Sequence, residues 1–130
     1  MNLGNPTNEL CTILVVDDDY PSYLYIEAAL RMCGYKLIYA SNGKDAVNIA
    51  LNQDISLILM DICLPIVSGI DATKQIRKVK PFLPIVAQTA ALFPDQIKAI
   101  NDSGCDVILA KPFQVNELYD VIKRVLVPIS

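Results

Sequence analysis

The chain has 130 residues, a length that suits one domain, and 53% of them are hydrophobic, which is ample for a buried core. Its net charge of −3 and scattered basic residues give no sign of a nucleic-acid surface. It contains no histidine, which excludes Ser-His and Cys-His nucleophiles and a phosphohistidine on this chain, and its four cysteines form no CxxC pair for zinc.

The start of the chain and its cysteines predict a cytoplasmic protein. Residues 1–10 lack the basic start and apolar stretch of a secretory signal, so we expect them to form a flexible N-terminal tail. No apolar run reaches the roughly 18 residues that a membrane-spanning helix needs, so membrane insertion is not expected. We interpret the cysteines as small buried hydrophobic residues in a reducing compartment: Cys11, Cys33, Cys63 and Cys105.

After this tail, short β-branched apolar runs alternate with segments of helical periodicity. The runs predict strands at Thr12–Val16, Tyr35–Ala40, Ile55–Met60, Pro84–Gln88 and Asp106–Leu109. The periodic segments predict helices at Pro21–Cys33, Gly43–Asn52, Gly69–Val79, Pro94–Ser103 and Val115–Val127. Pro21 and Pro94 suit the first turn of a helix, where a missing N–H costs nothing, and Gly34 and Gly104 suit a helix end.

Strands that each precede a helix predict a parallel sheet with helices on both faces, a doubly wound α/β fold, in one domain over residues 11–127. The runs Ile13–Val16 and Leu57–Met60 are apolar at every position, as strands buried on both faces should be. Ligands of such sheets bind beyond the carboxyl ends of the strands. That edge is therefore where a functional site is expected.

Polar residues follow four of the predicted strands and would meet at this edge. They are Asp17, Asp18 and Asp19 after the first strand, Asp61 after the third, Thr89 after the fourth, and Lys111 after the fifth. Each has a plain structural explanation alone, as a helix cap, a turn former, a strand residue or a solvated cation. Gathered carboxylates repel one another unless a cation lies among them, and oxygen ligands favour Mg²⁺. The set together predicts a magnesium-assisted phosphoryl site.

Four motifs in this order resemble the receiver domain of two-component response regulators. They are Val15–Asp19, Asp61–Gly69, Pro84–Ala90 and Lys111–Phe113, within a resemblance that covers about residues 11 to 127. The resemblance implies a flavodoxin-like five-stranded sheet of order 2-1-3-4-5, phosphorylation of Asp61, and catalytic roles for Asp61, Thr89 and Lys111. It also implies Mg²⁺ bound by Asp18 directly, Asp17 mostly through water, Asp61, and the backbone carbonyl of Cys63.

The partners implied by the resemblance are a sensor histidine kinase or histidine phosphotransfer protein as phosphodonor and an unidentified downstream protein. Multiple-turnover catalysis is not expected beyond the chain's own phosphorylation and slow dephosphorylation. Receivers usually carry an aromatic residue three positions before the lysine, but this chain has Ile108. Base rates favour a trans Lys111-Pro112 bond, whereas the resemblance favours cis. The resemblance also implies a surface for a partner protein near Phe93, Ile108, Phe113 and Tyr119.

Three other functions fit the residues less well. A haloacid dehalogenase-like phosphatase would match the spacing of Asp17 and Asp19, but Pro21 stands where a threonine or valine is expected and no cap is present. A receiver-like scaffold without phosphorylation would not need all of Asp17, Asp18, Asp61, Thr89 and Lys111. A flavodoxin-type flavin site needs a Ser/Thr-rich phosphate loop, and the Asp17–Asp19 acids would repel that phosphate.

Overall fold

A computed structural model describes residues 10–64, 67–90 and 92–126 of the chain. The predicted tail over residues 1–10 therefore lies outside the described residues except for Leu10, and so does Val127 at the predicted end of the last helix. Pro65 and Ala91 also lie outside them. No helix within the described ranges has both the length and the apolar character to cross a membrane.

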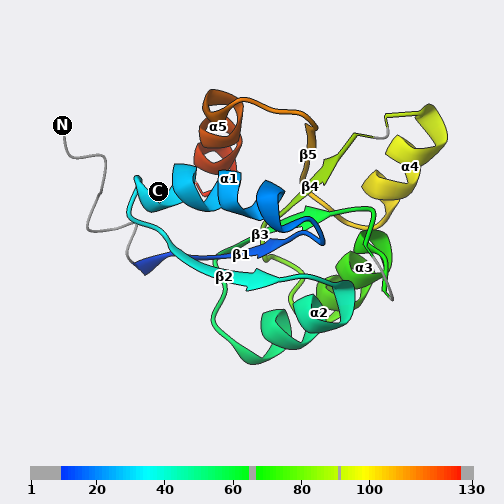
Figure 1. Cartoon of the computed structure of the whole chain (residues 1–130). Coiled ribbons are helices and arrows are strands. Elements are labelled where there is room, and N and C mark those ends of the chain that lie inside the picture. The colour runs from blue at the N-terminus through cyan, green and yellow to red at the C-terminus, as the bar shows by residue number, and fades with distance from the viewer. Residues whose placement is uncertain (1–9, 65–66, 91, 127–130) are drawn as a thin grey trace.

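Five parallel strands form one sheet in the order β2-β1-β3-β4-β5, which confirms the doubly wound α/β prediction (Figure 1). The strands are β1 (Thr12–Val16), β2 (Lys36–Ala40), β3 (Leu57–Asp61), β4 (Ile85–Thr89) and β5 (Val107–Ala110). The helices are α1 (Tyr20–Arg31), α2 (Gly43–Asn52), α3 (Gly69–Val79), α4 (Pro94–Asp102) and α5 (Val115–Val125). In Figure 1, α1 and α5 cover one face of the sheet and α2 and α3 cover the other.

Alternate side chains of each central strand enter two separate hydrophobic cores. Ile13 and Val15 of β1 pack with residues of α1 and α5, whereas Leu14 and Val16 pack with residues of α2 and α3. All four are fully buried, because successive side chains of a strand point to opposite faces and both faces are covered. The apolar runs thus have the burial that the sequence predicts.

Most predicted element ends agree with the structure to within one or two residues. Asp19 caps α1, since its carboxylate accepts the Ser22 N–H at 3.2 Å, and Pro21 lies in the first turn. Gly34 and Gly104 follow helices with φ of 86° and 102°, the left-handed region that glycine enters without strain. These residues therefore predict the helix ends correctly.

The ends of β3 and β4 differ from the prediction in a way that matters for the site. Each strand extends one residue further, so Asp61 pairs with Gln88 and Thr89 pairs with Ala110 in the sheet. The N–H of Lys111 donates to the Thr89 carbonyl at 2.9 Å. Asp61 and Thr89 are therefore the last paired residues of rigid strands and not the first residues of loops.

Candidate functional site

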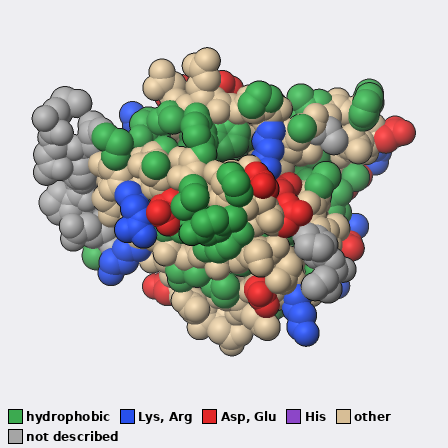
Figure 2. Space-filling view, in the orientation of Figure 1, with side chains coloured by type: hydrophobic (Ala, Val, Ile, Leu, Met, Phe, Trp, Pro, Cys, Tyr) green, Lys and Arg blue, Asp and Glu red, His purple; other side chains and the backbone are tan. Residues whose placement is uncertain are grey.

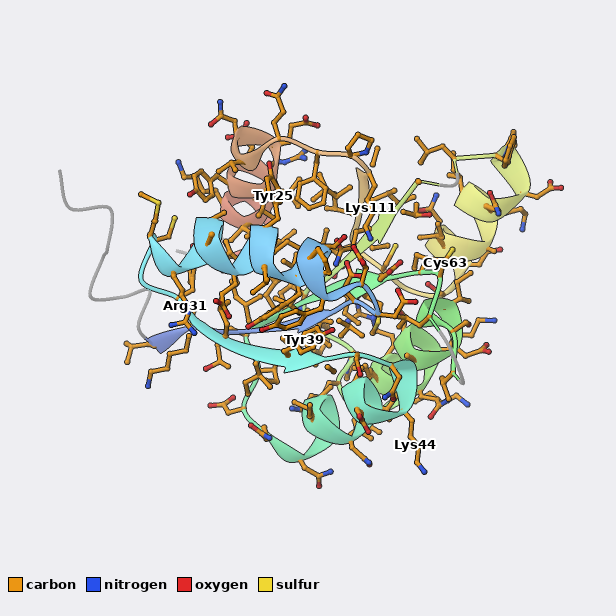
Figure 3. All side chains as sticks on the ribbon, viewed as in Figure 1. Tyr25, Arg31, Tyr39, Lys44, Cys63 and Lys111 are labelled. Atoms are coloured by element: carbon orange, nitrogen blue, oxygen red, sulfur yellow. The ribbon has the colours of Figure 1, made fainter. Side chains whose placement is uncertain are left out.

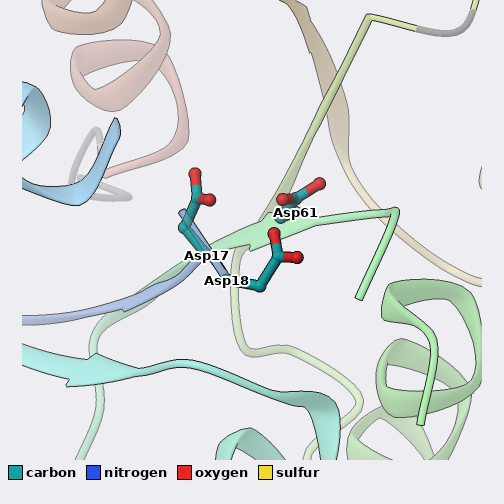
Figure 4. A group of neighbouring side chains, drawn as sticks. All are labelled: Asp17, Asp18 and Asp61. Carbon is teal, nitrogen blue, oxygen red and sulfur yellow. The ribbon is translucent and has the colours of Figure 1, made fainter. Parts of the chain in front are cut away.

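The carboxylates of Asp17, Asp18 and Asp61 gather at the carboxyl ends of β1 and β3 (Figure 4). One oxygen from each lies within 4.8 Å of the others. Asp17 and Asp61 are buried, at 0% and 5% exposure, while Asp18 is exposed. Acidic side chains are visible at this place on the surface in Figure 2. The predicted acid cluster is confirmed as a spatial cluster with one solvent-facing member.

Lys111 places its ammonium group between two of these acids. Its Nζ lies 3.2 Å from Asp17 Oδ2 and 3.5 Å from Asp61 Oδ2, and its side chain is 24% exposed (Figure 3). The Lys111-Pro112 peptide bond is cis, as the resemblance implied. The cluster holds three carboxylates and only one ammonium, so it keeps an excess of negative charge.

Burial shapes the protonation of both partners. Burial raises the pKa of the Asp61 carboxyl above its ordinary value of 3.8, although the Lys111 ammonium and the Cys63 N–H act in the opposite direction. Burial alone would lower the pKa of Lys111, but the carboxylates of Asp61 and Asp17 outweigh it and leave that pKa above 10.5. Lys111 therefore stays charged, and a further cation near Asp61 would favour the ionised form of the Asp61 carboxyl.

Thr89 and Cys63 complete the set of predicted residues. Both border a cleft of about 650 Å³ that also contacts the three acids and Lys111. Thr89 is 2% exposed, and the Cys63 N–H donates to Asp61 Oδ1 at 3.0 Å. The Cys63 thiol is exposed and the other three cysteines are half-buried, so the prediction that the cysteines are buried is wrong. The structure thus brings all six predicted site residues together: Asp17, Asp18, Asp61, Cys63, Thr89 and Lys111.

The loop after Asp61 approaches the strand end closely. A Cβ added to Gly69 would lie 2.1 Å from the Asp61 carbonyl oxygen and 2.7 Å from the Ile62 Cα, and neither backbone atom can move cheaply. The Gly69 N–H also donates to the Ile62 carbonyl at 3.1 Å. Gly69 therefore allows α3 to begin directly against the strand that carries Asp61.

The donor set fits a small hard cation. Three carboxylates offer oxygen atoms within the reach of one ion, and Asp18 faces solvent, where an ion can enter. Magnesium prefers oxygen ligands and keeps part of its water shell, which suits a site that is only partly enclosed.

Two residues near the site were missed by reasoning from the sequence. The Tyr39 hydroxyl donates to the Asp17 carbonyl at 2.8 Å, and Gln88 is 1% exposed with its Nε2 3.5 Å from the Val16 carbonyl. Gln88 could have been noticed as an amide in an otherwise apolar strand. Nothing in the sequence distinguishes Tyr39, because its contact depends on how β1 and β2 are aligned.

Two residues of the predicted partner surface also contact α1. The Tyr119 hydroxyl donates to the Ala29 carbonyl of α1 at 2.8 Å, and the Phe113 carbonyl accepts the Tyr25 hydroxyl of α1 at 3.2 Å. These two half-buried residues therefore also contact α1, and the partner surface near Phe93, Ile108, Phe113 and Tyr119 stays a prediction. Phe93 is 72% exposed, so it remains available at that surface.

Comparison with known proteins gives a family match over most of the chain. The family model of the response regulator receiver domain matches residues 13–123. Among solved structures, the receiver domain of the Pseudomonas aeruginosa sensor histidine kinase PA1611 is similar with a TM-score of 0.84 and 35% identity, over 89% of this chain and 97% of that chain. That structure has a magnesium ion coordinated in its active site cleft.

Similar sequences include both small and large proteins. Sporulation initiation phosphotransferase F of Bacillus subtilis is 29% identical over 88% of this chain and 92% of its own length. The autoinducer 1 sensor kinase/phosphatase LuxN of Vibrio campbellii is 32% identical over 115 residues, and there the match spans only 13% of that protein. The similarity therefore reaches both nearly whole small proteins and one part of a large kinase.

Proposed function

This chain belongs to the response regulator receiver domain family of two-component signal transduction, and we propose that Asp61 is the residue that takes the phosphoryl group. The observation that carries the proposal is the position of Asp61. Its carboxylate ends a rigid strand, contacts the Lys111 ammonium, and lies within one cation's reach of Asp17 and Asp18.

In the proposed reaction an Asp61 carboxylate oxygen attacks the phosphorus of a phosphohistidine on a partner protein. An oxygen–phosphorus bond forms, the nitrogen–phosphorus bond breaks, and its electron pair returns to the partner's imidazole. The transferred group carries negative charge on three equatorial oxygens, so catalysis depends on positioning and on nearby positive charge. Lys111 supplies one such charge, and the Cys63 N–H holds the Asp61 carboxylate in place.

We propose Mg²⁺ as the cofactor of this step. Asp18 would bind it directly, Asp17 mostly through water, and Asp61 and the Cys63 carbonyl would complete the protein ligands. The ion would neutralise charge on the phosphoryl oxygens. The surroundings of Asp17 and Asp18 support these different ligand roles. Asp17 already contacts Lys111 and accepts the Asp19 N–H at 2.9 Å, whereas the Asp18 carboxylate faces solvent.

Thr89 and Lys111 are proposed to bind the phosphoryl group after transfer. The Lys111 N–H is hydrogen-bonded to the Thr89 carbonyl, so the backbones of the two residues are joined beside the cleft. A hydroxyl donor and an ammonium donor can each bind one phosphoryl oxygen. Movement of these residues toward the phosphoryl group would alter the nearby surface and thereby change partner binding.

The proposed phosphodonor is a sensor histidine kinase or a histidine phosphotransfer protein, and the output is a change in binding to a downstream protein. The relatives include a phosphotransferase and a sensor kinase, which supports donors of this class. We propose the cytoplasm as the place of the reaction, since kinases form phosphohistidine from the ATP of that compartment.

Intact mass after incubation with acetyl phosphate tests the function class. A receiver should gain one phosphate when Mg²⁺ is present, gain none in chelator, and lose it slowly after the donor is removed. Continuous release of inorganic phosphate over many turnovers would indicate a hydrolase, and absence of any mass change with Mg²⁺ would indicate a binding scaffold. Either result would overturn the proposal.

A further inference from the structure

We propose that Tyr39 is a positioning residue for the cation site, because its hydroxyl fixes the peptide group that joins Asp17 to Asp18. The Tyr39 hydroxyl donates to the backbone carbonyl of Asp17 at 2.8 Å. The inference rests on the proposed function, since it concerns the same cation. It adds a residue from β2 to a site whose other members come from β1, β3, β4 and β5.

Two neighbouring residues of β2 hold both sides of Asp17. The Ala40 carbonyl accepts the Asp17 N–H at 3.1 Å, and the Tyr39 hydroxyl donates to the Asp17 carbonyl. The second contact fixes the plane of the peptide that leads to Asp18. Since that peptide bond is planar, its orientation sets the direction in which the Asp18 Cα leaves Asp17 in the turn Asp17–Asp19. The direction of the Asp18 side chain depends on it in turn.

Asp18 depends on this backbone constraint more than its neighbours do. The Asp17 carboxylate is held by the Asp19 N–H and by Lys111, and the Asp61 carboxylate is held by the Cys63 N–H and Lys111. Within the described part of the chain, the Asp18 carboxylate accepts no hydrogen bond that would orient it. The proposed direct ligand is therefore the acid whose own side chain is least restrained.

The Tyr39 ring is itself fixed by two tyrosines of α1. Its centroid lies 4.2 Å from that of Tyr23 and 5.8 Å from that of Tyr20, and Figure 3 shows Tyr39 between α1 and β2. Tyr23 is anchored in turn, because its hydroxyl donates to Glu27 at 2.7 Å.

The test compares two tyrosine-to-phenylalanine variants by magnesium calorimetry. Tyr39→Phe keeps the ring that packs against Tyr23 and Tyr20 and removes only the hydroxyl that contacts Asp17. Mg²⁺ should then bind about tenfold more weakly, at the low end of the effect of losing a group that orients a metal ligand. Tyr23→Phe removes the hydroxyl of the adjacent ring, which contacts Glu27 and not the turn. That control should bind Mg²⁺ like the wild type.

Amide exchange in chelator gives a readout that involves no metal. The Asp19 N–H, which donates to Asp17 Oδ1 within the same turn, should exchange faster in Tyr39→Phe than in Tyr23→Phe. If Tyr39→Phe fails to fold, the wild type still provides a test. The ring carbon that bears the Tyr39 hydroxyl should shift during Mg²⁺ titration with the dissociation constant found by calorimetry, and a resonance that does not move would overturn the proposal.

Asp18→Ala separates this inference from the proposed function. If Asp18→Ala abolishes Mg²⁺ binding while Tyr39→Phe binds and exchanges like Tyr23→Phe, then Tyr39 does not position the turn and the proposed site stands. If Asp18→Ala binds Mg²⁺ as tightly as the wild type, the cation site itself is wrong. Weak binding in both Asp18→Ala and Tyr39→Phe, with Tyr23→Phe unaffected, is the result that the structure leads us to expect.

Discussion

Replacement of Lys111 by methionine should strongly destabilise the protein in the absence of a divalent cation. The Lys111 ammonium lies 3.2 Å from an Asp17 oxygen and 3.5 Å from an Asp61 oxygen, and those side chains are 0% and 7% exposed. At an effective dielectric constant of about 20, each attraction is about 5 kcal/mol before the cost of dehydrating the ammonium. Removing one member of a buried ion pair typically costs about 3–5 kcal/mol because the other charge stays buried.

Lys98→Met provides a matched control at a solvent-exposed ion pair. Lys98 lies 2.9 Å from Asp102, closer than either contact of Lys111, but the two side chains are 77% and 62% exposed. An exposed pair of this spacing on a helix contributes only about 0.3–0.5 kcal/mol. Burial, and not distance, should therefore decide the outcome, with a loss of about 3 kcal/mol for Lys111→Met and less than about 0.5 kcal/mol for Lys98→Met.

Urea unfolding at neutral pH in chelator measures the free energy of unfolding of both variants. The expected result for Lys111→Met is a lower midpoint urea concentration with an unchanged dependence of the free energy on urea concentration. The pH dependence gives a second check. Burial raises the pKa of Asp61, so the folded protein holds this proton more tightly than the unfolded chain does, and acid relieves the cost of the buried carboxylate. Without Lys111 the pKa of Asp61 rises further. The difference in free energy of unfolding between Lys111→Met and the wild type should therefore become smaller as pH falls, and added Mg²⁺ should make it smaller too. Equal losses in Lys111→Met and Lys98→Met would refute the reasoning.

Three further predictions concern the cation, the lifetime of the phosphoryl group and the output surface. Calorimetry should show a sharp loss of cation affinity in Asp18→Ala and a smaller loss in Asp17→Ala, because a direct ligand contributes more than one acting through water; equal losses would contradict the proposed ligand roles. The resemblance to receivers implies that Cys63 and Ala91 border the path of the water that attacks the aspartyl phosphate. A thiol and a methyl group orient water poorly, so the phosphate should decay slowly, and Cys63→Asn with Ala91→Glu should speed decay by about 10–100-fold. An unchanged decay rate in that double variant would show that these positions do not control the water. A phosphoryl mimic such as beryllofluoride should shift amide resonances near Phe93 and Ile108, whereas shifts confined to α2 would place the output elsewhere.

Much of the fold could be predicted because its signals are local. Apolar runs mark the strands, and Asp19, Pro94 and Gly34 mark where helices begin or end. The site could be predicted because parallel strands bring their carboxyl ends to one edge, so the order of Asp17, Asp61, Thr89 and Lys111 along the chain was enough. The extra residue at the end of β3 could not be seen, since it depends on pairing between Asp61 and Gln88.

The contacts that refine the site depend on long-range geometry. Tyr39 reaches Asp17 only because β2 lies beside β1 with Val16 opposite Ala40. The contacts of Phe113 and Tyr119 with α1 could not be predicted, because a sequence does not show toward which neighbouring helix a half-buried ring turns. On α1 their partners are Tyr25 and Ala29.

The identity of the phosphoryl acceptor is tested most directly by comparing wild type with Asp61→Asn after incubation with acetyl phosphate and Mg²⁺. Asparagine keeps the shape of the side chain but lacks the charged oxygen that attacks phosphorus. Intact mass should show one hydroxylamine-sensitive phosphate on the wild type and none on Asp61→Asn, with urea unfolding confirming that the variant is folded. A full equivalent of hydroxylamine-sensitive phosphate on folded Asp61→Asn would contradict the account.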